Sequence, residues 1–266
     1  MIPRKAREDW VVGLLSLYAP LGLLEEGRDL VACFRDASDA RRAQRALDAS
    51  RVSSQLTTDI AEEDPLEAFR LASRPFSVGR RFWVDPGDPS DSEPPKGRTV
   101  LRVPAARAFG TGEHASTRLV LIALQEETVE GLSVLDVGTG SGILALAAAS
   151  LGARQVVACD VDADALFIAR ENLRLHSFGS FVRLVASSTD ALVGDFDLVL
   201  ANLLPQEFLP ARRSILARVA PGGRLLLSGI PREAEPDVIH KTRARRWRLA
   251  GRRVEEGWAC LCLERA

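Results

Sequence analysis

From residue 99 onward, short apolar runs alternate with segments of helical periodicity. The apolar runs predict five strands, at Ser133–Val137, Gln155–Asp160, Val182–Val185, Phe196–Ala201 and Arg224–Ser228. Strands that are apolar throughout and separated by helices are typical of a parallel sheet covered on both faces. The pattern therefore predicts an α/β fold for this part of the chain.

The last part of the chain departs from this alternation. Arg248–Val254 and Trp258–Leu263 have the pattern of strands, and Glu255-Glu256-Gly257 between them favours a hairpin turn. With the five preceding strands they predict a seven-stranded sheet that ends in an antiparallel hairpin.

The first 98 residues show shorter and more varied elements. Residues 1–60 are expected to form a small α+β unit, with helices at 7–18 and 38–49 and strands at 21–25, 29–34 and 52–60. Residues 61–98 are expected to be a connector, with a helix at 64–72, a strand at 82–84 and turn-forming residues at 85–97. The predicted division is thus 1–60, 61–98 and 99–266.

Charge and composition narrow the possible functions. The net charge is −1 and the pI about 6.4, so no overall field attracts nucleic acid or a membrane surface. None of the four cysteines forms a C-x-x-C pair and there are three histidines, so we expect no metal site. No apolar run reaches the ~18 residues needed to cross a bilayer. We expect a cytoplasmic monomer.

A glycine-rich turn follows the first strand of the α/β part. Asp136 ends this strand, and Gly138, Gly140 and Gly142 follow it before the next helix. Ligands of open α/β sheets bind at such strand ends. A dinucleotide fingerprint needs a third glycine where Ile143 stands, and Asp136 would repel a pyrophosphate. The turn suits the cationic sulfonium of S-adenosylmethionine (AdoMet), and with the closing hairpin it is typical of Rossmann-like class I methyltransferases rather than of dehydrogenases.

The second strand ends in Asp160, twenty residues after Gly140. A carboxylate at this position can accept hydrogen bonds from both ribose hydroxyls of the cofactor. The alternative is that Asp160 caps the next helix, but Asp162 can serve that role. We therefore favour ribose binding by Asp160.

The fourth strand ends in Asn202, followed by Leu203, Leu204 and Pro205. An amide at this strand end is placed to face the transferring methyl group, and we take Asn202 as the catalytic residue. Methyltransferases for planar bases or amides carry a proline pair and an aromatic residue here, which this chain lacks. An aliphatic amine is therefore the favoured target, and a turn or cap role for Asn202 is the alternative.

Before the first parallel strand, Phe109, Gly110 and Thr111 begin a loop that can fold over the cofactor and exclude water. The helix that follows begins close to Thr117, whose hydroxyl could meet the cofactor's carboxylate with the helix-start amides. His114 could be a base or a structural residue, and the sequence does not decide between them.

With these motifs the chain resembles the PrmA family, bacterial methyltransferases that modify the stalk-base protein of the large ribosomal subunit (ribosomal protein L-eleven). The matching stretches are 64–69, 79–84, 108–117, 134–144, the Ala-Asn-Leu-Leu around Asn202, 223–230 and 256–263. The resemblance implies that AdoMet is bound by Thr117, Gly138, Asp160 and Asn202. It also implies a ferredoxin-like N-terminal domain that grips the substrate protein.

Two departures qualify the resemblance. Ser116 replaces the first threonine of the family's Gly-Thr-Gly-x-His-x-Thr-Thr loop. The sequence begins at the predicted first helix, so we expect a truncated ferredoxin-like domain without its first strand. The expected function is methylation of lysine ε-amines of ribosomal protein L-eleven, with its N-terminal α-amine as a second target. Alternatives are a lysine methyltransferase for another protein, a small-molecule methyltransferase, and an RNA-binding module that uses the arginines of 241–248. No direct nucleic-acid binding is expected, because those arginines also fit a solvated helix end and strand start.

Overall fold

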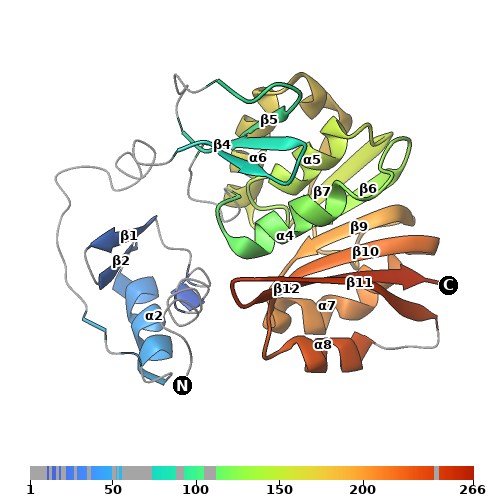
Figure 1. The fold of residues 1–266 in the computed structure, drawn as a ribbon. Helices are drawn as coiled ribbons and strands as arrows, with labels where there is room; N and C mark the ends of the chain where they lie inside the picture. The colour runs from blue at the N-terminus through green and yellow to red at the C-terminus, as the bar shows by residue number, and fades with distance from the viewer. Residues whose placement is uncertain are drawn as a thin grey trace.

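The computed structural model describes residues 11, 14–15, 18, 22–26, 29–34, 37–49, 52, 54–55, 74–87, 93–104, 112–242 and 246–266. In these residues it forms a seven-stranded, a three-stranded and a two-stranded sheet (Figure 1). No helix among them is both long and apolar enough to span a membrane.

The seven-stranded sheet confirms the predicted fold class. Its strands lie in the order β11-β12-β10-β9-β6-β7-β8. Their bounds are β6 Ser133–Val137, β7 Gln155–Asp160, β8 Val182–Ala186, β9 Phe196–Asn202, β10 Val219–Pro231, β11 Trp247–Glu255 and β12 Trp258–Arg265. The five strands from β6 to β10 run parallel, and β12 lies antiparallel between β10 and β11. The sheet is therefore the class I methyltransferase sheet with its closing hairpin.

Helices cover both faces of this sheet. They are α4 Ala115–Leu124, α5 Ile143–Ser150, α6 Ala163–Arg174, the 3-10 helix η1 Ser177–Phe181, α7 Pro205–Ala217 and α8 Glu235–Thr242. Alternation along β9 explains the two cores: Leu198 and Leu200 pack in the core with α4 and α5, whereas Val199 packs in the core with α7 and α8. The period of two within each strand thus builds a three-layer α/β domain.

The three-stranded sheet is larger than the one strand predicted in the connector. It consists of β3 Phe76–Val78, β4 Phe82–Asp85 and β5 Thr99–Arg102, and β4 pairs with β5 in parallel. Its buried residues share the core of α4 and α5. Strand β5 pairs with β4 across the expected boundary at residue 98. The short strand β5 was not recognisable from its local sequence pattern, because it depends on this pairing.

The N-terminal part contains β1 Gly22–Glu26, β2 Asp29–Cys33 and α2 Ala37–Ala49. The antiparallel β1–β2 pair and the helix were predicted. The predicted strand at 52–60 is wrong for the residues described there, 52 and 54–55, which are not in a strand. The Val52 amide instead donates to the Leu47 carbonyl at 2.9 Å, which closes the end of α2. Residues 56–60 and the predicted helix at 64–72 lie outside the described residues.

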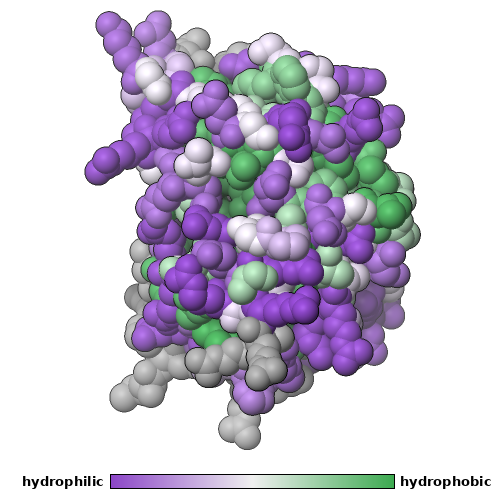
Figure 2. Space-filling model, turned by 90° about the vertical axis from the view of Figure 1, so that its right-hand side faces the viewer, coloured by the Kyte–Doolittle hydropathy of each residue, from purple (hydrophilic) through white to green (hydrophobic). Residues whose placement is uncertain are grey.

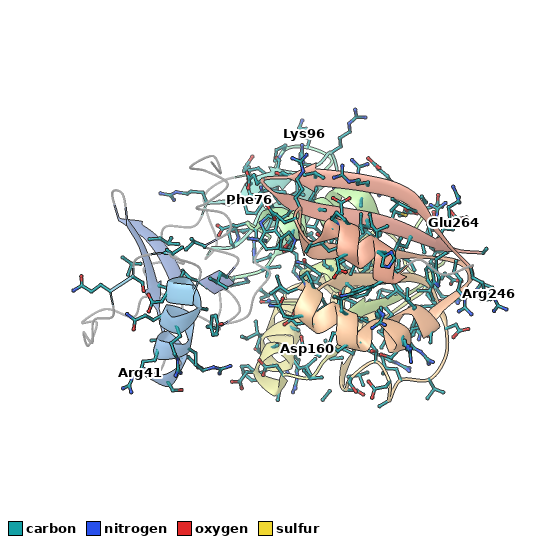
Figure 3. All side chains as sticks on the ribbon, turned by 90° about the horizontal axis from the view of Figure 1, so that it is seen from below. Arg41, Phe76, Lys96, Asp160, Arg246 and Glu264 are labelled. Carbon is teal, nitrogen blue, oxygen red and sulfur yellow. The ribbon has the colours of Figure 1, made fainter. Side chains whose placement is uncertain are left out.

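The direction of the strands locates the edge where a ligand is expected. In Figure 1 the end of β12 lies at the right, and the parallel strands run the opposite way, so their carboxyl ends lie at the left. Figure 3 agrees, with Asp160 toward that side and Glu264 and Arg246 at the far end. Figure 2 shows the opposite face, at the amino ends of the strands, where hydrophilic residues dominate. Open α/β sheets bind ligands at the carboxyl edge.

Candidate functional site

The glycine-rich turn adopts a backbone that side chains disfavour. Gly138, Gly140 and Gly142 have φ of 67°, 53° and 84°, in the left-handed region. A Cβ on Gly138 would also lie 2.6 Å from a methyl group of Leu203. The Gly138 amide donates to the Cys159 carbonyl at 2.9 Å, which fixes the turn to the end of β7. The turn thus presents bare backbone at the edge of the sheet.

Asp136 lies below this turn and is fully buried. Its Oδ2 accepts a hydrogen bond of 2.6 Å from the Thr139 hydroxyl, while Oδ1 is buried without a hydrogen-bond partner. Burial raises the pKa of Asp136 to about 7. A cationic group beside this carboxyl would favour its ionised form, which agrees with the predicted role toward a sulfonium.

Asp160 lies beside the turn, as its spacing from Gly140 predicted. Its carboxylate accepts from the Gly140 amide and from the Asp162 amide, each at 3.0 Å. Asp162 is the residue that caps α6, since its carboxylate accepts from the Asp164 amide at 2.9 Å. The helix-cap alternative for Asp160 is therefore wrong, and its carboxylate stands at the carboxyl edge of β7.

Val161 was missed in the sequence. It follows Asp160 at the sheet edge and its side chain is 79% exposed, although it is apolar. An apolar side chain exposed beside a strand-end acid offers a surface for a flat ligand group. The signal was present as an apolar residue directly after Asp160.

Asn202 and Thr117 meet, although they are far apart in sequence. The Asn202 Nδ2 donates to the Thr117 hydroxyl at 3.1 Å, and the Asn202 Oδ1 is buried without a partner. Asn202 does not cap α7, because the cap residue is Leu204, whose amide is held by the Glu207 carboxylate at 2.9 Å. The alternative reading of Asn202 as a cap is therefore wrong, and its carbonyl oxygen remains available as an acceptor.

His114 is the N-cap of α4. Its Nδ1 lies 2.7 Å from the Ser116 hydroxyl, and its ring packs edge-on against Trp258 with centroids 4.7 Å apart. Burial, with help from the nearby Arg118, lowers its pKa to about 4. His114 is therefore a neutral capping residue near pH 7. This supports its interpretation as a structural residue rather than as a base. Phe109, Gly110 and Thr111 lie outside the described residues.

The described site residues fit AdoMet. The turn meets Asp160 through Gly140, Thr117 meets Asn202, and Leu203 packs over Gly138. The unpartnered oxygens of Asp136 and Asn202 offer acceptors to a ligand that carries cationic and N–H groups. In the described part of the chain, no group of three or more His, Cys, Asp or Glu could hold a metal ion.

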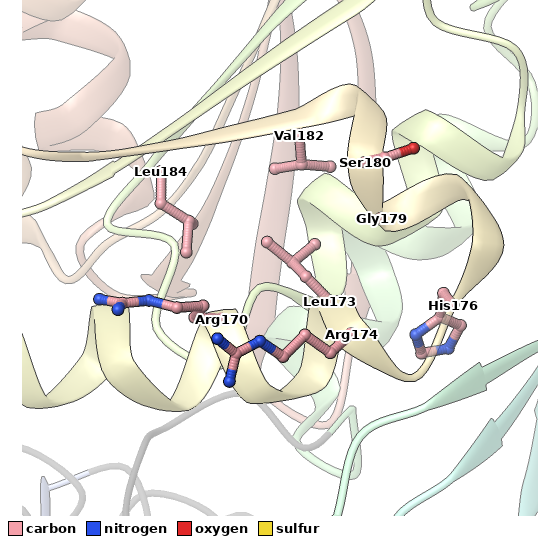
Figure 4. Close-up of a pocket in the computed structure, with 8 residues that line it drawn as sticks. All are labelled: Arg170, Leu173, Arg174, His176, Gly179, Ser180, Val182 and Leu184. Carbon is pink, nitrogen blue, oxygen red and sulfur yellow. The ribbon is translucent and has the colours of Figure 1, made fainter.

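A separate hollow of about 450 Å³ lies between α6, η1 and β8 (Figure 4). Arg170 and Arg174 border it, and Leu173, Val182 and Leu184 form its apolar lining. None of the predicted site residues lines this hollow, so it is distinct from the carboxyl edge of the sheet.

The arginines of the hairpin are paired within the chain. Arg248 contacts Glu264 at 2.9 Å, Arg252 contacts Glu235 at 2.7 Å, and Arg253 pairs with Glu126. Arginines engaged with carboxylates are poorly placed to bind phosphates. Of these three arginines only Arg248 belongs to the segment 241–248 of the RNA-binding alternative, and Arg243 and Arg245 of that segment lie outside the described residues, so this pairing does not test the alternative.

Known proteins resemble this chain over most of its length. Residues 15–266 match the sequence profile of the family described as "Ribosomal protein L11 methyltransferase (PrmA)". A ribosomal protein L11 methyltransferase of Geobacter metallireducens is 42% identical over 77% of the chain and 67% of its own length. One of Syntrophotalea carbinolica is 44% identical over 70% of the chain and 61% of its own length. The chain therefore spans about two thirds or less of these relatives.

A solved structure has the same fold. The ribosomal protein L11 methylase of Lactobacillus delbrueckii subsp. bulgaricus superposes with a TM-score of 0.66 and 27% identity. The match covers 73% of this chain and 99% of that one. The similarity thus extends over nearly the whole of that structure.

Proposed function

Because the chain belongs to the ribosomal protein L11 methyltransferase (PrmA) family, we propose that it methylates amino groups of ribosomal protein L11. The family is one of AdoMet-dependent methyltransferases, and AdoMet is the cofactor. The targets proposed are lysine ε-amines, with the N-terminal α-amine as a second candidate.

The observation that carries the proposal is the placement of Asn202. Its Oδ1 is buried, unpartnered and held at the end of β9 by the contact with Thr117. Leu203 and Leu204 follow it, where no aromatic ring is available to stack on a planar target. An amide oxygen in an apolar setting suits an aliphatic amine with N–H groups to donate.

The chain's residues would act by holding and orienting. AdoMet supplies an electrophilic methyl group on its sulfonium. Asp160 would hold the ribose hydroxyls, and Thr117 with the first turn of α4 would hold the carboxylate end. Asp136 would face positive charge near the glycine turn. These contacts would fix the methyl group in line with the incoming amine.

The acceptor amine must be neutral to react. A lysine amine has an ordinary pKa near 10.4, and removal from water lowers this pKa. Asn202 Oδ1 would then accept one N–H of the neutral amine and direct its lone pair toward the methyl group. No described side chain is needed as an obligate base in this scheme.

The proposed setting follows from the substrate. L11 is part of the ribosomal stalk base, so the enzyme would encounter this substrate in the cytoplasm. We propose that the enzyme acts there as a monomer.

Labelling tests the substrate. Ribosomal proteins from cells that lack the enzyme are incubated with the purified chain and methyl-labelled AdoMet. The proposal predicts label in L11. Label in another protein or in the small-molecule fraction would refute the substrate and keep the methyltransferase activity, whereas no label in any fraction would refute both.

A further inference from the structure

The hairpin turn between β11 and β12 contains a residue poorly suited to its backbone. Glu256 and Gly257 are its two central residues, with φ of 48° and 81°. Positive φ at both positions is that of a type I′ turn, which strongly prefers Asn-Gly. Glu256 is the one non-glycine residue with positive φ in the described part of the chain. A glutamate there needs a reason beyond the turn itself.

Arg118 gives that reason. Its Nη2 lies 2.8 Å from the carboxylates of both Glu255 and Glu256, and its Nε lies 3.0 Å from Glu255. The same guanidinium donates to the Glu113 carbonyl. The Arg118 side chain is only 20% exposed and its contacts with Glu255 are partly buried, whereas the Glu256 side chain is 37% exposed. Although burial opposes it, the hydrogen bonds with the two glutamates raise the pKa of Arg118 above its ordinary value.

These contacts lie at the cofactor end of α4. Arg118 follows Thr117, the residue that holds Asn202. The neighbouring His114 packs on Trp258, directly after the turn. The Ser228 hydroxyl, which is fully buried, also donates to the Ser116 carbonyl at 2.9 Å. The first turn of α4 is thus fastened to the hairpin and to β10 from several sides.

The opposite end of α4 offers a comparison. There Arg253 of β11 pairs with Glu126, just beyond the helix. Both ion pairs join α4 to the same hairpin. Only the pair at Arg118 lies beside Thr117. Variants of the two pairs can therefore distinguish an effect on docking of the helix from an effect on the position of the cofactor-binding residues.

We infer that Glu256 is a positioning residue: its carboxylate holds Arg118, and through it the first turn of α4, where Thr117 meets Asn202 and the cofactor. The inference rests on the proposed use of Thr117 and Asn202 for AdoMet. Glu256 is less favourable for the turn than asparagine, and it is retained because its side chain positions the first turn of α4. Function and stability then oppose each other at one position.

Glu256→Asn tests this opposition. Asparagine suits the turn but is too short and uncharged to hold Arg118. We expect the Kd for AdoMet, measured by calorimetry, to rise roughly threefold to tenfold. The melting temperature should stay the same or rise. In methyl-transfer assays the KM for AdoMet should rise, while the KM for the acceptor stays unchanged.

Two further variants complete the experiment. Arg253→Gln removes the pair at the other end of α4 and should leave the Kd for AdoMet unchanged. Glu256→Gln keeps the strained turn and removes the charge, so it should weaken AdoMet binding without raising the melting temperature. It also decides the question if Glu256→Asn does not fold.

The outcomes are distinct. Wild-type affinity for AdoMet in Glu256→Asn would overturn the inference. If Glu256→Asn does not fold, wild-type affinity in Glu256→Gln would overturn it. Equal weakening by Arg253→Gln would also overturn it, because general docking of the helix would then explain the effect. A wild-type chain that does not bind AdoMet would instead refute the cofactor assignments on which the inference rests.

Discussion

The side-chain amide of Asn202 donates a hydrogen bond of 3.1 Å to the hydroxyl of Thr117, 85 residues earlier in the chain. This contact joins the end of β9 to the first turn of α4. It uses the amide nitrogen and leaves the carbonyl oxygen as an acceptor. Thr117 therefore sets which way Asn202 faces.

Asn202→Ala removes both the link and the acceptor. We expect kcat for methyl transfer to fall about 100-fold, as for loss of a group that orients a reacting atom, and AdoMet binding to weaken. Steady-state kinetics with calorimetry measure both effects. Full methylation with normal AdoMet binding would show that Asn202 has neither role.

Thr117→Val keeps the shape of Thr117 and removes its hydroxyl. If Thr117 acts by orienting Asn202, this change should cost about 1–2 kcal/mol of transition-state stabilisation. The cost to kcat should largely vanish in the Asn202→Ala background. Additive effects on kcat in the double variant would contradict an orienting role.

AdoMet binding should depend on pH through Asp136. Its pKa in the free protein is about 7 because of burial, above the ordinary value of 3.8. For folding alone, this group stabilises below pH 3.8, and its contribution is lost as pH rises toward 7. A cationic ligand favours the carboxylate, so AdoMet affinity should increase as pH rises toward 7 and level off above it.

Calorimetry between pH 5.5 and 8.5, a range of roughly 1.5 units to either side of that pKa, measures this dependence. Asp136→Asn should flatten the curve, and S-adenosylhomocysteine, which lacks the sulfonium charge, should show a shallower one. An equally steep curve for S-adenosylhomocysteine would place Asp136 against a different group of the cofactor.

His114 should make the protein acid-sensitive. Its pKa is lowered from 6.5 to about 4, chiefly by burial, so the folded state favours the neutral ring. Its contribution is present above pH 6.5 and is lost as pH falls toward 4, by at most about 3 kcal/mol. Urea unfolding at several pH values should show a smaller loss for His114→Asn, which keeps a helix cap. Identical pH dependence in the two proteins would contradict the burial of a neutral ring.

Gly229→Ala should disturb the segment after Asn202. Gly229 has φ of 79°, and an added Cβ would lie 2.6 Å from the Leu203 carbonyl oxygen. We expect a loss of about 1–3 kcal/mol in the free energy of unfolding and a clear fall in kcat. Gly222→Ala is the matched control, since Gly222 has φ of 77° with open space around it. It should share the loss of stability from strain and keep kcat, and equal falls in kcat would contradict the argument.

The parallel sheet and the turn could be predicted because their signals are local. Each strand is an apolar run, and the glycines after Asp136 stand where the backbone needs positive φ. The spacing of Asp160 from Gly140 translates directly into their contact. Local patterns were sufficient wherever sequence neighbours determine the geometry.

The rest depended on contacts between distant segments. Strand β5 exists through pairing with β4, and the Val52 amide is used by the end of α2 rather than by a sheet. The contact of Arg118 with Glu255 spans 137 positions, and no periodicity announces it. Such features follow from packing and not from the local pattern.

The central claim is tested most directly by the intact mass of purified, unmethylated ribosomal protein L11 after incubation with the chain and AdoMet. We predict mass increments of whole methyl groups, located by peptide sequencing on lysine ε-amines or the α-amine, and strongly reduced in Asn202→Ala. An unchanged mass of L11 under conditions where calorimetry shows AdoMet bound would contradict the claim.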